Sequence, residues 1–180
     1  NPLLFRALPK IESWLKTRPR LWQMLNGRAE RRAAAANLAT ANRLSDAADS
    51  GVRLAIVVGH GPVGRSVHRL LRGAGLSTVV IDLNMDTVSS LNAEGQAAIF
   101  GDASHESILE QAGMRRASHL VLTLPHTTDR AAVVAAARNL NPNVRILVRA
   151  RYLREREDLE QAGATAAVFE EVEAAVALAR

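Results

Sequence analysis

From residue 52 onward, short apolar runs alternate with segments that have helical periodicity. The predicted strands are residues 52–58, 77–81, 96–100, 119–123, 144–148 and 166–169. The predicted helices are residues 62–73, 85–94, 105–112, 128–139, 153–162 and 170–180. Continuous apolar strands are buried on both faces, as in a parallel sheet covered by helices on each side. The pattern therefore predicts an α/β protein with a Rossmann-like, doubly wound parallel sheet of six strands.

Residues 1–50 differ from the rest in charge. They hold nine basic and four acidic residues, so the whole formal net charge of +5 lies there. Pro9, Pro19 and Gly27 divide the segment into short helical stretches. We expect a basic helical linker over residues 1–50 and the Rossmann-like domain over residues 51–180. Trp14 and Trp22 among basic residues favour contact with an anionic membrane surface; the alternative is packing on the domain or on another subunit.

Composition excludes several classes of protein. The chain has no Cys, which rules out disulfides, Cys-ligated zinc and a thiol nucleophile. No stretch reaches 18 uninterrupted apolar residues, so we expect no membrane span, and we expect no signal peptide. Nucleic-acid binding is disfavoured, because aromatic residues make up 3% of the chain and the basic excess lies in the linker. The chain begins with Asn1, and we expect a fragment of a longer protein.

A glycine-rich loop follows the first predicted strand directly. It consists of Gly59, His60, Gly61, Pro62, Val63 and Gly64, and a predicted helix follows. In such a loop the first glycine makes a tight turn, the second lets the backbone approach a pyrophosphate, and the third lets the helix pack on the strand. Free N–H groups at a helix start attract anions. The spacing therefore predicts a nucleotide-phosphate site.

Asp82 ends the second predicted strand, with Leu83 beside it, 18 residues after Gly64. A carboxylate at this place accepts hydrogen bonds from ribose hydroxyls and repels a 2′-phosphate. We therefore predict AMP or NAD(H), with ADP and ATP as further candidates, rather than NADP. The alternative is that Asp82 serves as a turn residue or helix cap ahead of Asn84.

Two further strand ends are predicted to line the same site, because ligands of this fold bind at the carboxyl edge of the sheet. Asp102 and Ala103 follow the third strand. Asp102 either contacts the adenine or ribose end or forms an Asx-turn with the next helix. Thr123 and Leu124 follow the fourth strand and are expected on the phosphate side.

Taken together, these stretches resemble the RCK (TrkA-N type) nucleotide-binding domain. The resemblance rests on residues 59–64, the Val-Ile-Asp strand end at 80–82, Phe-Gly-Asp-Ala-Ser at 100–104, Leu-Thr-Leu-Pro at 122–125 and Ile-Leu-Val-Arg-Ala-Arg at 146–151. It covers about residues 52–169. The beginning of the chain is similar to the linker that follows the last transmembrane helix of Kef-type monovalent cation:proton antiporters (the CPA2 family).

The resemblance implies a non-enzymatic regulatory domain of a potassium (or sodium):proton antiporter, on the cytosolic face of the inner or plasma membrane. It implies an adenine nucleotide held by Gly59, Gly61, Gly64, Asp82 and Asp102. It also implies a homodimer, with the protein's own transmembrane transport domain as partner. Many members place an arginine in the glycine loop, where this chain has Pro62; Arg65 is a candidate replacement.

Two alternatives stay open at this point: an NAD-dependent oxidoreductase fragment, and a structural dimerisation module with a vestigial crevice. The first is disfavoured because residues 51–180 contain no Lys and a single Tyr, Tyr152. The five histidines lack metal-ligand spacing. We therefore predict neither a catalytic residue nor a metal site.

Overall fold

The computed structural model describes residues 33–42, 44, 51–125, 128–152 and 155–169. The described residues from 36 onward fall in one compact unit, Ala36–Arg180, whose fold is given below. The helices predicted in residues 1–32 and 170–180 lie outside the described residues, whereas residues 33–42 are helical. No helix in the described part of the chain is long and apolar enough to cross a bilayer.

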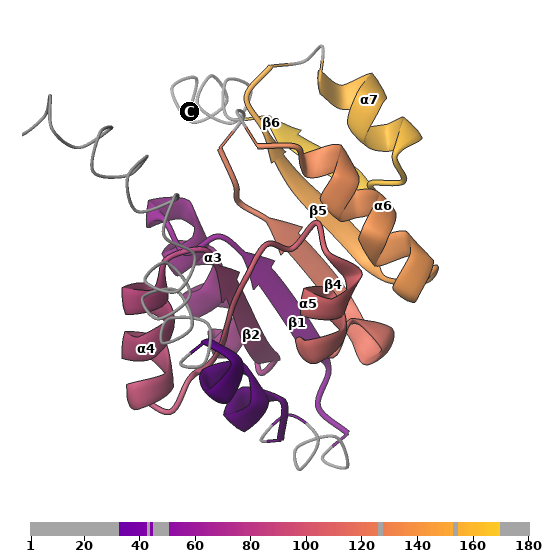
Figure 1. Ribbon diagram of the computed structural model, residues 1–180. Helices are drawn as coiled ribbons and strands as arrows, with labels where there is room; N and C mark the ends of the chain where they lie inside the picture. The colour runs from indigo at the N-terminus through magenta and orange to yellow at the C-terminus, as the bar shows by residue number, and fades with distance from the viewer. Residues whose placement is uncertain (1–32, 43, 45–50, 126–127, 153–154, 170–180) are drawn as a thin grey trace, which may run out of the picture. The chain divides into compact units, whose positions relative to one another are not determined.

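Six parallel strands form a single sheet (Figure 1). The strands are β1 (Leu54–Val58), β2 (Ser77–Asp82), β3 (Ala97–Phe100), β4 (Ala117–Leu122), β5 (Arg145–Ala150) and β6 (Ala166–Phe169). Their order is β3-β2-β1-β4-β5-β6, so the direction of winding reverses between β1 and β4. The predicted doubly wound sheet is confirmed, and the reversal places a crevice at the carboxyl ends of these two strands.

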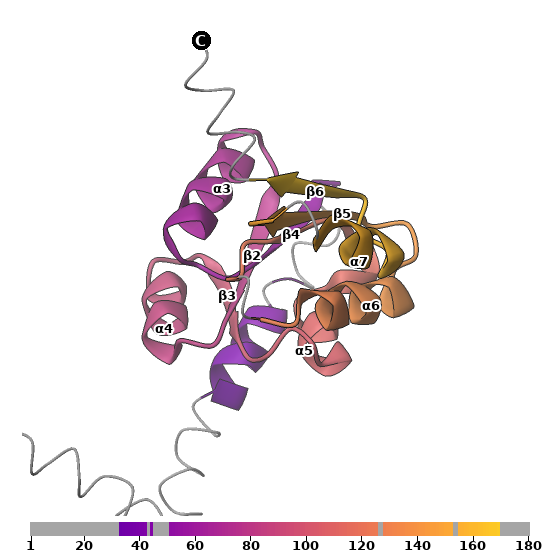
Figure 2. The ribbon, with the colours of Figure 1, turned by 90° about the horizontal axis from the view of Figure 1, so that it is seen from above.

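Helices cover both faces of the sheet (Figure 2). One face carries α3 (Pro62–Gly73) and α4 (Met85–Ala93), and the other carries α5 (Glu106–Gln111), α6 (Arg130–Leu140) and α7 (Glu155–Gln161). A short 3₁₀ turn, η2 (Met114–Arg116), precedes β4. This division follows from right-handed crossovers, which send the chain to opposite faces on the two sides of the switch point.

Local sequence explains where several helices begin and end. Gly75, Gly95, Gly113 and Gly163 have φ values of 79°, 74°, 81° and 106°, so the predicted glycine stops are confirmed. Asn84 caps α4, because its side chain accepts hydrogen bonds from the Asp86 and Thr87 N–H groups at 2.9 and 3.2 Å. The cap of α4 is therefore Asn84 and not Asp82.

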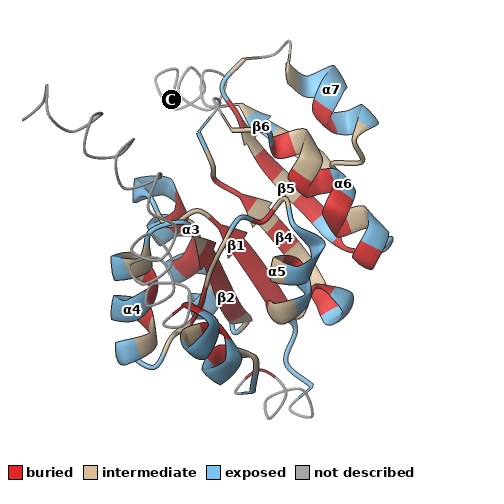
Figure 3. Cartoon of the chain, viewed as in Figure 1, coloured by how far each residue is buried: buried red, intermediate tan, exposed pale blue. Residues whose placement is uncertain are grey.

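Buried residues are concentrated in the central strands (Figure 3), and the buried apolar side chains form one large and one smaller cluster. All five residues of β1 are buried, which is why this strand is an unbroken apolar run. On the face of the sheet toward α3, the strands β4, β5 and β6 are less completely covered than β1. There Val121, Leu147 and Val168 line an apolar groove of about 480 Å³ together with α3. On α3, Leu70 is 72% exposed at this groove.

A helical segment before the sheet packs on its β3 edge. The Asn37 side chain donates to the Phe100 carbonyl and accepts from the Phe100 N–H, both at 2.8 Å. The Thr40 hydroxyl donates to the Ala98 carbonyl at 3.0 Å. Both side chains are buried. These bonds occupy backbone groups that an edge strand otherwise leaves open to another chain.

Candidate functional site

A cleft of about 430 Å³ lies at the carboxyl ends of β1, β2, β3 and β4. Of the twelve predicted site residues, ten line this cleft: Gly59, His60, Gly61, Pro62, Asp82, Leu83, Asp102, Ala103, Thr123 and Leu124. Val63 points instead into the apolar groove, and Gly64 is buried under the loop. Segments up to 65 residues apart in the sequence thus meet at one edge of the sheet, as the fold requires.

The geometry of the glycine loop matches the demands on its first and third glycines. Gly59 has φ +90°, a conformation that side chains rarely adopt, and its N–H donates to the Ile81 carbonyl at 2.8 Å. A Cβ atom on Gly64 would lie 2.1 Å from the Gly59 carbonyl oxygen. Gly61 is exposed, with nothing within 4 Å of where its Cβ would be. The loop therefore leaves its middle open to a ligand.

Asp82 is held in a fixed orientation by two backbone donors. Its Oδ2 accepts the His60 N–H at 2.6 Å, and its Oδ1 accepts the Asn84 N–H at 2.8 Å. The carboxylate links the glycine loop to the end of β2 and lines the cleft. Each carboxylate oxygen can accept more than one hydrogen bond, so capacity remains for the hydroxyls of a ribose.

Asp102 adopts the Asx-turn that was one of its two predicted arrangements. Its Oδ1 accepts the Ser104 N–H at 2.9 Å. Hydrogen bonds from the backbone and side chain of Ser104 lower the pKa of the Asp102 carboxyl. The side chain is exposed and also lines the cleft, so the turn does not prevent contact with a ligand.

Thr123 ties the end of β4 to the glycine loop. Its buried hydroxyl lies 3.0 Å from the Val58 carbonyl and 2.9 Å from the Gly59 carbonyl, and its N–H donates to Val58 at 2.9 Å. Thr123 is therefore a support for the loop, in addition to lining the cleft.

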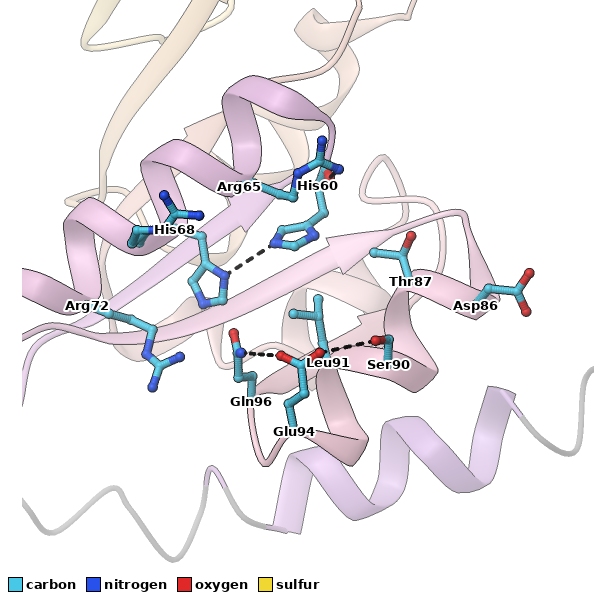
Figure 4. Close-up of a pocket in the computed structure, with 11 residues that line it drawn as sticks. His60, Arg65, His68, Arg72, Asp86, Thr87, Ser90, Leu91, Glu94 and Gln96 are labelled. Carbon is cyan, nitrogen blue, oxygen red and sulfur yellow. Dashed lines mark hydrogen bonds between the residues drawn. The ribbon is translucent and has the colours of Figure 1, made fainter.

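A second pocket, of about 540 Å³, lies between α3 and α4 (Figure 4). The His60 and His68 rings meet there edge to face, at an interplanar angle of 67°, with Nε2 of His60 3.4 Å from Nδ1 of His68. The Nε2 of His68 lies 2.9 Å from the Thr78 hydroxyl. Burial is the main cause that lowers the pKa of both histidines. Arg65 lines this pocket and not the cleft.

Six residues outside the twelve predicted site residues also line the cleft: Val58, Ile81, Gly101, Pro125, Thr128 and Arg149. Arg149 lies near the end of β5, and its Nη1 is 3.4 Å from the Thr123 carbonyl. Its place at the carboxyl end of a predicted strand was the signal that could have identified it. Within the described residues, no three His, Asp or Glu side chains gather in a way that could hold a metal ion.

A doubly wound parallel sheet with a glycine loop after β1 and an acidic residue at the end of β2 places the chain in the Rossmann-like class of α/β domains. The chain belongs to the TrkA-N domain family, whose model matches residues 55–170. The cation/proton antiporter YbaL of Escherichia coli (strain K12) is 34% identical over 121 residues. That match covers 67% of this chain and 22% of YbaL, so the chain spans about a fifth of that relative's length.

Solved structures agree with this family. The TrkA-N domain of the Escherichia coli inner membrane protein YbaL has a TM-score of 0.67 and 32% identity, over 71% of this chain and 94% of that one. The Kef CTD of Shewanella denitrificans, in an AMP-bound form, has a TM-score of 0.59 and 26% identity, over 70% of this chain and 76% of that one. The predicted resemblance to TrkA-N domains of Kef-type transport proteins is confirmed.

Proposed function

We propose that this chain is a non-enzymatic regulatory domain of a potassium (or sodium):proton antiporter and that it binds an adenine nucleotide to gate ion exchange. The observation that carries the proposal is the cleft, in which the oriented Asp82 carboxylate lies beside an open glycine loop. The AMP in the related Kef CTD supports a nucleotide as ligand. The nucleotides that fit are AMP and NAD(H), with ADP and ATP as further candidates.

The first test is a thermal-shift panel of the 180-residue protein with AMP, ADP, ATP, NAD, NADH and NADP. A ligand at 100 times its dissociation constant stabilises the folded state by about 2.7 kcal/mol. For a chain of this length, each kcal/mol of stabilisation raises Tm by about 2–4 °C, so the bound ligand should raise Tm by about 5–11 °C. NADP is expected to give a smaller shift than NAD, because its 2′-phosphate would face the Asp82 carboxylate.

The matched variants are Asp82→Asn and Asp86→Asn. Asp86 is exposed on α4 and lines the other pocket, so its substitution is expected to leave the shifts unchanged. Asp82→Asn is expected to reduce them and to narrow the difference between NAD and NADP. If no nucleotide shifts the unsubstituted protein, nucleotide binding is wrong and the structural dimerisation module becomes the better explanation.

Gating is tested in the full-length antiporter that contains this domain, reconstituted in vesicles. Proton-coupled K⁺ and Na⁺ fluxes are compared with and without the nucleotide from the panel, on the side that holds the domain. A ligand changes flux only if it binds two states with different affinity. Equal flux in both conditions would refute gating even if the nucleotide binds. Turnover of NADH with small carbonyl substrates would instead favour the oxidoreductase alternative.

We also propose a homodimer in which a second copy packs on the apolar groove beside β4, β5 and β6. The support is the exposure of Leu70 (72%) and Val168 (47%) on one continuous surface, because exposed apolar patches of this kind mark contact sites. Analytical ultracentrifugation should detect a dimer that Leu70→Glu converts to monomer. Leu83→Glu, an exposed leucine outside the groove, is the control.

The location and remaining partners follow from the same proposal. The domain would lie on the cytosolic face of the inner membrane, joined to its own transport domain, with residues 1–50 near the lipid surface. Sedimentation with anionic and with neutral vesicles tests the last point. Binding to anionic vesicles that disappears in high salt supports contact through the basic linker, whereas equal binding to both refutes it.

A further inference from the structure

The cleft has an unfavourable charge balance for a ligand that carries phosphate. Its ionisable lining residues are Asp82, Asp102, His60 and Arg149. Burial, followed by the charge of Arg65, lowers the pKa of His60, so its ring is neutral near pH 7. Two carboxylates therefore face a single permanent cation among the described residues that line the cleft. An entering phosphate dianion needs that cation more than it would in a neutral site.

The glycine loop supplies less positive potential here than its spacing suggests. Pro62 occupies the first position of α3 and has no N–H to offer. The Arg65 side chain lies 3.4 Å from the His60 carbonyl and lines the pocket between α3 and α4 (Figure 4). Arg65 is therefore on the other side of the loop from the cleft.

Arg149 approaches the loop from the opposite direction. Its Nη1 lies 3.4 Å from the Thr123 carbonyl, and the Thr123 hydroxyl lies 2.9 Å from the Gly59 carbonyl. The guanidinium group is thus placed beside the residue that supports the glycine loop. It reaches the cleft beside the end of β4, at Thr123.

The backbone of Arg149 is fixed by a buried ion pair. Arg130 Nη1 donates to the Arg149 carbonyl at 2.6 Å, and Arg130 Nη2 lies 2.9 Å from a Glu155 carboxylate oxygen. Arg130 is 6% exposed and Glu155 19% exposed. This contact holds the main chain at the end of β5, from which the Arg149 side chain extends.

We propose that Arg149 is the phosphate-binding cation of the cleft. It takes the role that an arginine in the glycine loop would have, since this chain has Pro62 at that position. Its planar guanidinium forms paired hydrogen bonds to the oxygens of a nucleotide phosphate, the geometry that arginine provides for phosphates. This inference rests on the proposed nucleotide-binding function. It adds the residue that distinguishes a nucleotide from the corresponding nucleoside.

The experiment compares AMP with adenosine, which has the same base and ribose but no phosphate. Isothermal titration of the 180-residue protein gives both affinities for the unsubstituted chain, Arg149→Gln and Arg145→Gln. Arg145 is the control, because it is exposed and begins β5 at the opposite end of the sheet. For Arg149→Gln we expect AMP affinity to fall at least about tenfold, as for a lost charged hydrogen bond, while adenosine affinity stays within about twofold.

The ratio of the two affinities is the deciding quantity, because a partly unfolded sample weakens both ligands equally. Arg149→Lys keeps the charge without the planar fork and should give an intermediate ratio. A ratio that is unchanged in Arg149→Gln, or that falls equally in Arg145→Gln, would overturn the proposal. If the unsubstituted protein binds no nucleotide of the thermal-shift panel, the proposed function itself fails, and this inference fails with it.

Discussion

The docking of the helical segment on β3 yields a quantitative prediction for Asn37→Ala. The substitution removes two hydrogen bonds at once, since the Asn37 amide pairs with both the N–H and the carbonyl of Phe100 at 2.8 Å. Asn37 is 6% exposed, so water replaces the lost partners poorly. Phe100 immediately precedes Gly101 and Asp102, which line the cleft. The variant therefore tests the support of one wall of the candidate site.

The expected cost follows from these contacts. Each hydrogen bond contributes roughly 1 kcal/mol, and leaving a partly buried backbone group without a partner adds about 1 kcal/mol more. A total of about 2–3 kcal/mol, at about 2–4 °C per kcal/mol for a chain of this size, predicts a fall in Tm of about 4–12 °C. Differential scanning calorimetry or thermal denaturation followed by circular dichroism measures it.

Asn139→Ala is the matched control. Asn139 is also helical, near the end of α6, but it is exposed and bonds only the Glu106 side chain, at 2.9 Å. Both substitutions gain similar helix propensity, so their difference isolates the Phe100 contacts. If the two variants unfold within about 1 °C of each other, the reasoning that this helix is held by Asn37 is refuted.

Three further predictions concern the loop, the histidine pair and the buried ion pair. Gly64→Ala should lower Tm strongly, because its Cβ would lie 2.1 Å from a backbone carbonyl oxygen, whereas Gly73→Ala, with open space around it, should be neutral or stabilising by up to about 1 kcal/mol. Burial, followed by electrostatic interaction with His60 and Arg72, lowers the pKa of His68, which favours a neutral His68 ring in the folded protein. The stability that this neutral ring contributes is therefore complete above the unfolded pKa of about 6.5 and is lost as the pH falls below it. Urea titrations from about pH 7.5 to about pH 5 give the free energy of unfolding at each pH, and this free energy should fall less steeply with decreasing pH in His68→Gln than in the unsubstituted protein. The same dependence on pH in both proteins would contradict the prediction. Glu155→Gln should cost about 3 kcal/mol or more in chemical denaturation, because it leaves a buried arginine unpaired, while Glu160→Gln, in an exposed pair, should cost less than about 1 kcal/mol; equal costs would contradict the difference in burial.

Several elements of the fold were predictable because their signals are local. An apolar run such as β1 indicates a strand buried on both faces, and Gly75 after a helical stretch indicates its end. The rule that ligands bind at the carboxyl ends of parallel strands then brings Asp82, Asp102 and Thr123 to one edge without any coordinates. Strand limits were less well predicted: β4 begins at Ala117 and not at His119, and β5 continues to Ala150. Ends of elements depend on pairing with neighbours, which a short window does not contain.

The sequence by itself determined the alternation of strands and helices, the glycine loop and the acidic residue after β2, since each is encoded within a few neighbouring residues. Only the tertiary structure decided which long side chains serve the cleft. Arg65 adjoins the glycine loop in sequence yet lies in the other pocket, whereas Arg149, from a strand two places away in the sheet, reaches the cleft. The Asn37–Phe100 contact spans 63 residues. The directions of long side chains and the pairing of distant segments arise from the packing of the whole sheet and its helices, and a single stretch of sequence carries no record of them.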